Sequence, residues 1–169
     1  AQGTPDPDLL KVLLGDAYFS RPPPKSTGRE HFNLTWLKAK LGSIGKQISD
    51  SDVQATLCEL TALSVSDAIE RTSRADEISN IWLCGGGAKN TTLCERLQQL
   101  HSDRKVRSIQ AAGADPDYLE AIAFAWLAKQ TMEGLPGNLP DTSGAEEFRI
   151  LGAIYGGSVD AMRTPSYRY

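Results

Sequence analysis

Apolar residues recur at helical spacing along much of the chain. The first stripe runs from Leu9 to Leu14 and follows Asp6 and Pro7. An aspartate can cap a helix, and a proline suits the first helical position because no N–H is needed there. We therefore expect the first helix to begin at this pair.

The same spacing predicts four further helices, over residues 32–41, 51–72, 91–101 and 115–133. Asp115 and Pro116 repeat the cap-and-proline start at the last of them. Trp36 and Trp126 lie in apolar parts of these segments, so we expect both in the core.

Two shorter segments have the composition of strands. Residues 77–84 stop abruptly at a glycine triplet, and residues 106–109 form the second segment. Residues 150–154 are expected to form a short apolar strand or turn. Trp82, in the first predicted strand, is expected in the core. Because strands and helices alternate, the predicted fold class is α/β, with a short parallel sheet flanked by several helices.

Composition narrows the function classes. The chain has 169 residues, 40% hydrophobic and 23% charged, which is ordinary for a globular domain. Its net charge of −3 argues against a general nucleic-acid binder. No apolar run approaches the roughly 20 residues that span a bilayer. Cys58, Cys84 and Cys94 lack the spacing of zinc ligands. We expect a cytoplasmic protein with reduced thiols and without a nucleic-acid, membrane or metal site.

The glycine triplet carries the clearest chemical signal. Gly85, Gly86 and Gly87 stand between the first predicted strand and a predicted helix. Ligands of α/β sheets bind at the carboxyl ends of strands, and glycines let an anionic or flat group approach the backbone. The helix that follows offers free N–H groups. The alternative is a plain tight turn without a ligand.

A second candidate is a cationic loop that follows three prolines. Lys25, Ser26, Thr27, Gly28 and Arg29 combine two cations, two hydroxyls and a glycine on a stiff backbone. This set can hold an anion through charge-assisted hydrogen bonds. The alternative, which the residues alone favour, is a solvated loop before a helix.

The remaining polar candidates are single residues. Glu120 lies in an apolar stretch and can bind a sugar hydroxyl, although facing water is the simpler interpretation. His31 and His101 are expected on the surface or at helix ends. Arg104 lies in an expected solvated turn.

Taken together, the motifs resemble the anhydro-N-acetylmuramic acid kinase family. The segments that carry the resemblance are PPPKSTGREHFN, DVQATLCELTALSVSDAI, WLCGGGAKNTTL, GADPDYLEAIAFAWLA and GLPGNLPDTSGA, in that order. They match the C-terminal, ATP-binding portion of this two-lobed sugar kinase. The resemblance covers residues 5–157, and residues 158–169 are expected to be a surface tail.

The resemblance implies a fold and a reaction. The family belongs to the actin-like and hexokinase-like ATPase superfamily, with two ribonuclease H-like lobes and ATP between them. Its members use ATP and Mg²⁺ to phosphorylate 1,6-anhydro-N-acetylmuramic acid at the 6-oxygen. Water opens the anhydro ring in the same reaction and gives N-acetylmuramic acid 6-phosphate. This chemistry serves peptidoglycan recycling. The resemblance also implies that the whole kinase can form a homodimer.

The resemblance also assigns residues. The glycine triplet matches the adenosine motif, followed by Asn90, and Glu120 matches a carboxylate that faces the sugar. The cationic loop, residues 25–29, matches a segment near the cleft, and residues 138–145 match a closing loop. No residue of this chain matches the family's catalytic aspartate or its phosphate loop. The N-terminal lobe is therefore expected to supply both.

Two other functions fit the same residues. One is a non-catalytic nucleotide-binding module that kept the pocket and lost the base. The other is a structural or interaction domain in which the glycine triplet is only a turn.

Overall fold

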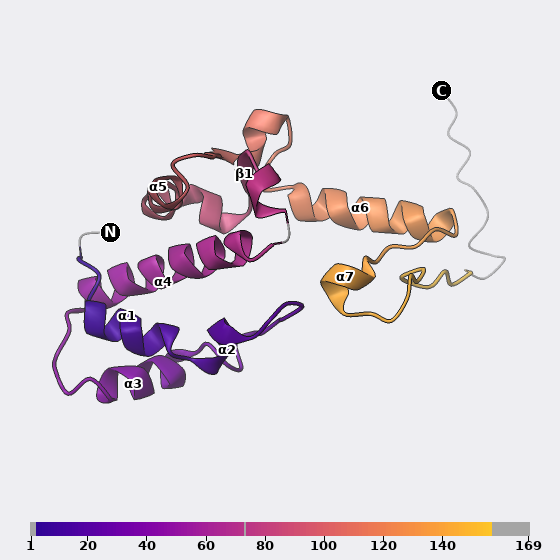
Figure 1. Cartoon of the computed structure of the whole chain (residues 1–169). Coiled ribbons are helices and arrows are strands. Elements are labelled where there is room, and N and C mark those ends of the chain that lie inside the picture. Colours follow the sequence, from indigo (N-terminus) through magenta and orange to yellow (C-terminus); the bar gives the residue numbers. More distant parts are fainter. Residues whose placement is uncertain (1–2, 73, 157–169) are drawn as a thin grey trace, which may run out of the picture. The chain divides into compact units, whose positions relative to one another are not determined.

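The computed structural model describes residues 3–72 and 74–156, which divide into two compact units (Figure 1). Unit 1 comprises Ala1–Glu120 and unit 2 comprises Ala121–Tyr169. The expected surface tail, residues 158–169, lies outside the described residues. None of the helices in the described ranges combines the length and apolarity that crossing a bilayer requires.

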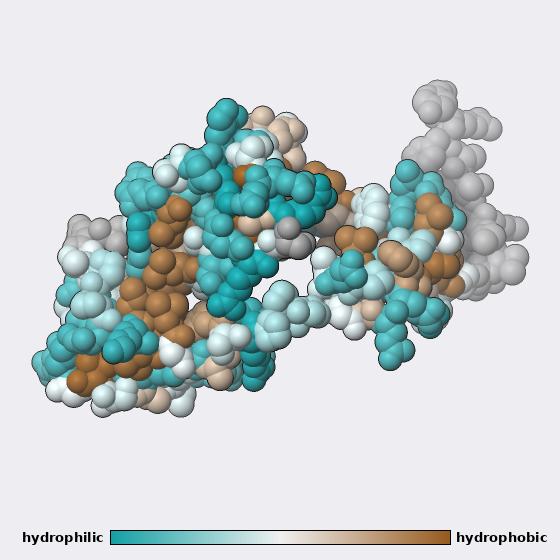
Figure 2. Space-filling view, viewed as in Figure 1, coloured by the Kyte–Doolittle hydropathy of each residue, from teal (hydrophilic) through white to brown (hydrophobic). Residues whose placement is uncertain are grey.

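Unit 1 contains a layer of three helices in which α1 packs against both of its neighbours (Figure 1). The helices are α1 (Pro7–Leu14), α3 (Leu34–Gly42) and α4 (Asp50–Glu70). Leu9 and Leu13 of α1 are fully buried and pack with Val53 and Leu60 of α4. Trp36 packs against this cluster, as predicted. Figure 2 shows the apolar side chains of this layer.

The start of α1 confirms the predicted cap and ties the helix to α4. The Asp6 carboxylate accepts the N–H of Asp8 at 3.1 Å and of Leu9 at 3.0 Å, with Pro7 in the first helical position. The Asp6 N–H donates to Oγ1 of Thr56 at 2.8 Å, and this hydroxyl donates to the Asp52 carbonyl oxygen at 2.6 Å. The helix start is therefore held from both sides.

A βαβ unit follows the helical layer and confirms the α/β class. Strand β1 (Asn80–Leu83) pairs in parallel with β2 (Lys105–Ser108), and α5 (Thr91–Leu100) connects them. β1 is shorter than the predicted 77–84, because η1 (Ala75–Glu77) is a 3-10 turn in which Arg74 forms an ion pair with Glu77.

The βαβ unit is joined to α4 by a buried polar cluster that the sequence did not reveal. His101 was expected on the surface or at a helix end, and it is the C-cap residue of α5, but only 1% of its surface is exposed. Arg104 was expected in a solvated turn, but only 7% of its surface is exposed. Arg104 pairs with the Glu70 carboxylate of α4 and donates to the carbonyl oxygen of Ala75 at 3.2 Å. The expectation for Arg104 was wrong because its partner Glu70 lies 34 residues away in the sequence.

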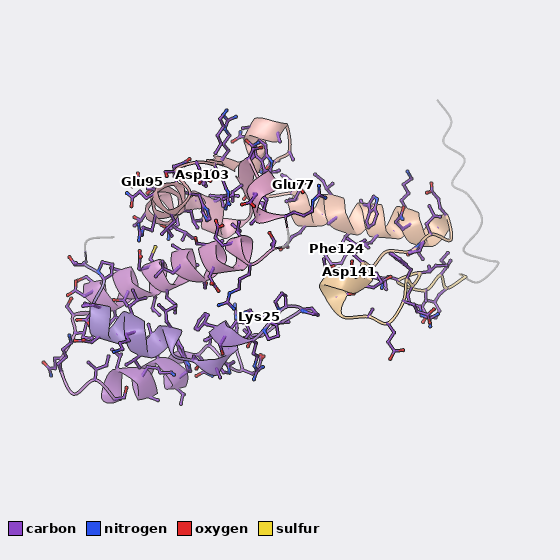
Figure 3. All side chains as sticks on the ribbon, viewed as in Figure 1. Lys25, Glu77, Glu95, Asp103, Phe124 and Asp141 are labelled. Atoms are coloured by element: carbon purple, nitrogen blue, oxygen red, sulfur yellow. The ribbon has the colours of Figure 1, made fainter. Side chains whose placement is uncertain are left out.

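Unit 2 contains most of α6 (Leu119–Met132) together with α7 (Pro140–Ser143). The helix starts later than predicted, because Asp115 accepts the Asp117 N–H at 2.9 Å and shapes a turn instead. No residue of α6 is buried, so the expectation that Trp126 lies in the core was wrong. Trp82 of β1 was also expected in the core, but 40% of its surface is exposed. Phe124, labelled in Figure 3, is 71% exposed.

The described part of unit 2 that follows α6, apart from α7, is a loop held partly by the side-chain amide of Asn138. Asn138 Oδ1 accepts the Arg149 N–H at 2.6 Å, and its amide nitrogen donates to the carbonyl oxygen of Glu147 at 3.0 Å. Residues 150–154 were expected to be a short strand or turn, but this described segment is irregular, with a bend at Gly152.

The packing of α1 predicts the outcome of a matched pair of substitutions. Leu13→Ala should lower the free energy of unfolding by about 2–5 kcal/mol, because it removes buried methyl groups and leaves a cavity. Leu34→Ala should change it by less than about 0.5 kcal/mol, because that side chain is 64% exposed. Urea unfolding of both variants measures the difference. Equal losses would show that α1 does not pack as described.

Candidate functional site

The parallel strands bring two connecting segments to one edge of the sheet. Leu83, the last residue of β1, pairs with Ser108, the last residue of β2. The chain then continues after β1 through Gly85 into the 3-10 turn η2 (Gly86–Lys89), and after β2 into η3 (Ile109–Ala112). Carboxyl ends of strands are the usual ligand sites of α/β sheets.

A hollow of about 690 Å³ lies between these segments. We call residues 85–89 the glycine wall and residues 113–117 the acidic wall. The hollow is lined by Ala88 and Lys89 of the glycine wall, by Ser108 and Gln110, and by all residues of the acidic wall. The predicted binding residues Gly85, Gly86 and Gly87 are not among its lining residues and lead into it from β1. Its volume is within the usual range for small-molecule sites, about 300–1,000 Å³.

The glycine wall depends on the absence of side chains. Gly85 has φ +67° and ψ −166°, a conformation that residues with a Cβ rarely adopt. Its N–H donates to the carbonyl oxygen of Pro116 at 3.3 Å, which joins the two walls. A Cβ added at Gly86 would meet no atom within 4 Å, so the space in front of this residue is open.

Asn90 has a structural role in this site. Its side-chain oxygen accepts the N–H of Leu93 at 3.2 Å and caps α5. Asn90 is not among the residues that line the hollow. It therefore fixes where α5 begins, and through this the position of the glycine wall.

The charges of the hollow are mostly paired. Lys89 Nζ lies 2.8 Å from Oδ1 and 2.9 Å from Oδ2 of Asp117. This hydrogen bond and the carboxylate charge raise the pKa of Lys89, so the ammonium stays charged. Asp115 accepts the Asp117 N–H and forms no ion pair within 4 Å among the described residues, although its charge contributes to the raised pKa of Lys89. One carboxylate is thus left over, and the hollow suits a neutral polar group better than a polyphosphate.

The cationic loop lies elsewhere in unit 1, and no residue of it lines this hollow. Lys25, labelled in Figure 3, donates to the carbonyl oxygens of Tyr18 at 3.2 Å and Phe19 at 3.1 Å, in α2 (Ala17–Ser20). The Gly28 N–H donates to the Glu30 carboxylate at 2.8 Å. These bonds favour the structural interpretation of the loop.

The other loop residues divide between a second hollow and solvent. Thr27 helps to line an apolar hollow of about 330 Å³, together with aromatic side chains that include Phe32 and Trp36. Ser26 and Arg29 are exposed, and neither side chain bonds another described residue.

Asp16 organises this region, and no local sequence signal identified it. Its carboxylate accepts the Tyr18 N–H at 3.1 Å and the Trp36 Nε1–H at 2.9 Å. It also lies 3.1 Å from His31 Nε2 and 3.3 Å from Lys40 Nζ. Burial raises the pKa of Asp16, but the bonds from Trp36, Tyr18, His31 and Lys40 outweigh burial and hold it well below its usual range.

Glu120 is exposed at the second position of α6. Its side chain forms no hydrogen bond or ion pair with another described residue and does not line the hollow. It follows the acidic wall by three residues, so it lies close in sequence to the site without being part of it.

The contacts of Asp16 predict a pH-dependent loss of stability on substitution. Asp16→Asn should lower the free energy of unfolding by about 2–3 kcal/mol at pH 7, because four charge-assisted contacts are weakened. A lowered carboxyl pKa stabilises the fold above the unfolded pKa of about 3.9, and the effect is lost as pH falls through the folded pKa. The difference between parent and variant should therefore shrink below about pH 4.

Urea unfolding between pH 7 and pH 2 measures this difference. Asp67→Asn is the control, because Asp67 forms only an exposed pair with Arg71, and such pairs contribute little. A constant difference for Asp16→Asn down to pH 2 would contradict the assigned contacts.

Comparison with known proteins agrees with the motifs. A family model described as anhydro-N-acetylmuramic acid kinase matches residues 1–157. Curated relatives with that same name are 50% identical in Coxiella burnetii over 157 residues and 48% identical in Xylella fastidiosa over 155 residues. A relative in Pseudomonas syringae pv. tomato is 46% identical over 155 residues.

These matches cover 92–93% of the chain but only 40–42% of each relative. The chain thus spans about two fifths of the length of the curated relatives that it matches.

Proposed function

Because this chain belongs to the anhydro-N-acetylmuramic acid kinase family, we propose that it supplies the ATP-binding part of such a kinase. The observation that carries the proposal is the hollow between the glycine wall and the acidic wall, at the carboxyl edge of the sheet. The family match supports ATP as the ligand, and the volume and position of the hollow support it as the site.

The hollow is suited to the nucleoside end of ATP. Ser108, Gln110 and Asp115 line it with hydroxyl, amide and carboxylate groups, which can bond ribose hydroxyls and the polar edge of a base. The open space at Gly86 lets a flat ring approach the backbone. The unpaired Asp115 carboxylate disfavours phosphates here, so the triphosphate would extend out of the hollow.

Mg²⁺ would reach the site with the phosphates, because it is usually held by one or two carboxylates together with substrate oxygens. Among the residues that the structure describes, no three His, Cys, Asp or Glu side chains lie together as ligands. We therefore assign no residue of this chain to the ion. Its charge would neutralise the phosphates during transfer.

Glu120 would hold a hydroxyl of the sugar. Its carboxylate is exposed and unpaired among the described residues, and α6 places it just after the acidic wall. The loop over residues 138–145, which contains α7, would close over the substrate. A closed site would exclude water other than the one that reacts.

In the reaction proposed for the whole kinase, water adds to C1 of 1,6-anhydro-N-acetylmuramic acid as the C1–O6 bond of the anhydro bridge breaks. The freed O6 takes the γ-phosphoryl group of ATP, which gives N-acetylmuramic acid 6-phosphate and ADP, and the proton of the water passes to the general base. This chain would bind and orient the nucleotide. The general base that activates the water is placed in the rest of the kinase, because no residue of this chain matches it. The product serves peptidoglycan recycling in the cytoplasm.

The unit formed by β1, α5 and β2 would be part of a ribonuclease H-like lobe. Parallel pairing across a connecting helix supports this, and the other strands would come from the N-terminal portion of the kinase. The relatives' greater length leaves room for that second lobe. The whole kinase would act as a homodimer.

The nucleotide proposal predicts a specific loss of binding. Gly86→Val should weaken ATP binding roughly tenfold or more, because a branched side chain would occupy the space that the ligand needs. The fold should persist, because nothing in the structure lies within 4 Å of the added Cβ. Titration calorimetry on the 169-residue chain measures the affinity.

Gly42→Val is the matched control, because its added Cβ also meets no atom within 4 Å and Gly42 is the last residue of α3, away from the segments that follow β1 and β2. It should bind ATP like the parent. Equal affinities in the parent and both variants would remove the glycine wall from the binding site. A parent chain that binds no nucleotide would favour a structural domain.

The assignment of Glu120 predicts a change in turnover. In the full-length kinase that contains this segment, Glu120→Gln should lower kcat about tenfold, with the KM for ATP changed less than about twofold. Glu133→Gln, at an exposed glutamate beyond the end of α6, should leave both unchanged. A coupled assay of ADP release measures them. Normal turnover for Glu120→Gln would make this residue an ordinary surface glutamate.

A further inference from the structure

Two links join the walls of the hollow across a long gap in sequence. Lys89 Nζ contacts both carboxylate oxygens of Asp117, at 2.8 and 2.9 Å, although the residues are 28 positions apart. Beside this pair, the Gly85 N–H donates to the carbonyl oxygen of Pro116 at 3.3 Å. One link is electrostatic, and the other is a single backbone hydrogen bond.

The ion pair is poorly placed to stabilise the fold. The side chain of Lys89 is 65% exposed and that of Asp117 is 55% exposed. Exposed ion pairs contribute little to folding, because water screens them and both side chains lose freedom. Yet both residues line the hollow, and the pair spans the gap between its two walls.

The acidic wall transmits this constraint because it is internally bonded. The Asp117 N–H donates to the Asp115 carboxylate at 2.9 Å, and the Tyr118 N–H donates to the Asp115 carbonyl oxygen at 3.1 Å. These bonds close a tight turn. Any contact that fixes the side chain of Asp117 therefore fixes the turn, including the Pro116 carbonyl that Gly85 uses.

We propose that Lys89 and Asp117 form a latch that holds the acidic wall against the glycine wall and sets the width of the nucleoside pocket. This role rests on the nucleotide binding proposed above. Lys89 is a positioning residue that acts through Asp117, and neither side chain needs to touch the ligand. A pocket with fixed walls binds more tightly because less freedom is lost on binding.

Adenosine binding to the 169-residue chain tests the latch. Lys89→Met and Asp117→Asn should each weaken binding about tenfold, because the pocket is no longer preorganised. The double variant Lys89→Asp with Asp117→Lys restores an ion pair of opposite direction, and should recover affinity to within about threefold of the parent. Melting temperatures should stay within about 2 °C, as expected for an exposed pair.

Arg71→Met is the control, because Arg71 forms a comparably exposed ion pair with Asp67, each side chain being 49% exposed. It should bind adenosine like the parent. Failure of the reversed pair to recover affinity would overturn the latch, because it would mean that Lys89 contacts the ligand directly. Parent-like affinity in Lys89→Met would overturn it as well.

Hydrogen exchange tests the latch without any ligand. In Lys89→Met the Gly85 amide should exchange about tenfold faster than in the parent, because its bond to Pro116 opens more often. The Arg71→Met control should show no change at Gly85. An unchanged rate in Lys89→Met would overturn the latch. A parent chain that does not bind adenosine would refute the nucleotide proposal instead, and the exchange rate would still decide the latch.

Discussion

The site depends on the parallel pairing of two short strands. Ile81 faces Val106 and Leu83 faces Ser108, so both strands end at the same edge of the sheet. An antiparallel pair would have sent the two following segments to opposite edges. The hollow between the glycine wall and the acidic wall exists because of this pairing. Its two walls come from segments that the sequence separates by the whole of α5.

A pair of four-residue strands is too small to be stable alone, so the register must be held from outside. Gln98 of α5 donates to the carbonyl oxygen of Arg104 at 2.9 Å and accepts the Val106 N–H at 3.1 Å. Arg96 pairs with Glu59 of α4 at 2.7 Å, and Arg104 pairs with Glu70. The long helix α4 thus serves two functions, closing the apolar core on one side and anchoring the strands on another.

Local signals in the sequence predicted the five longer helices and the glycine turn after β1, because caps, spacing and glycines act within a few residues. The four-residue helices α2 and α7 were not predicted, because they are too short to show a helical spacing. Asp6 with Pro7 marks the start of α1, and the triplet marks the end of β1. The buried His101, the Asp16 cluster and the Lys89–Asp117 pair depend on partners 15 to 34 residues away, which no local pattern reveals. The predicted helix start at Asp115 was wrong, because an aspartate carboxylate can cap a turn as readily as a helix.

The central claim is that the hollow at the carboxyl edge of the sheet binds the nucleoside end of ATP. Amide NMR spectra of the 169-residue chain, recorded during titration with adenosine, test it most directly. We expect saturable shifts of the amide signals of Gly86, Ala88, Gly113, Ala114, Asp115 and Asp117, with those of Thr27 and Phe32 unchanged. Shifts confined to the apolar hollow beside Thr27, or no shifts at saturating adenosine, would contradict it.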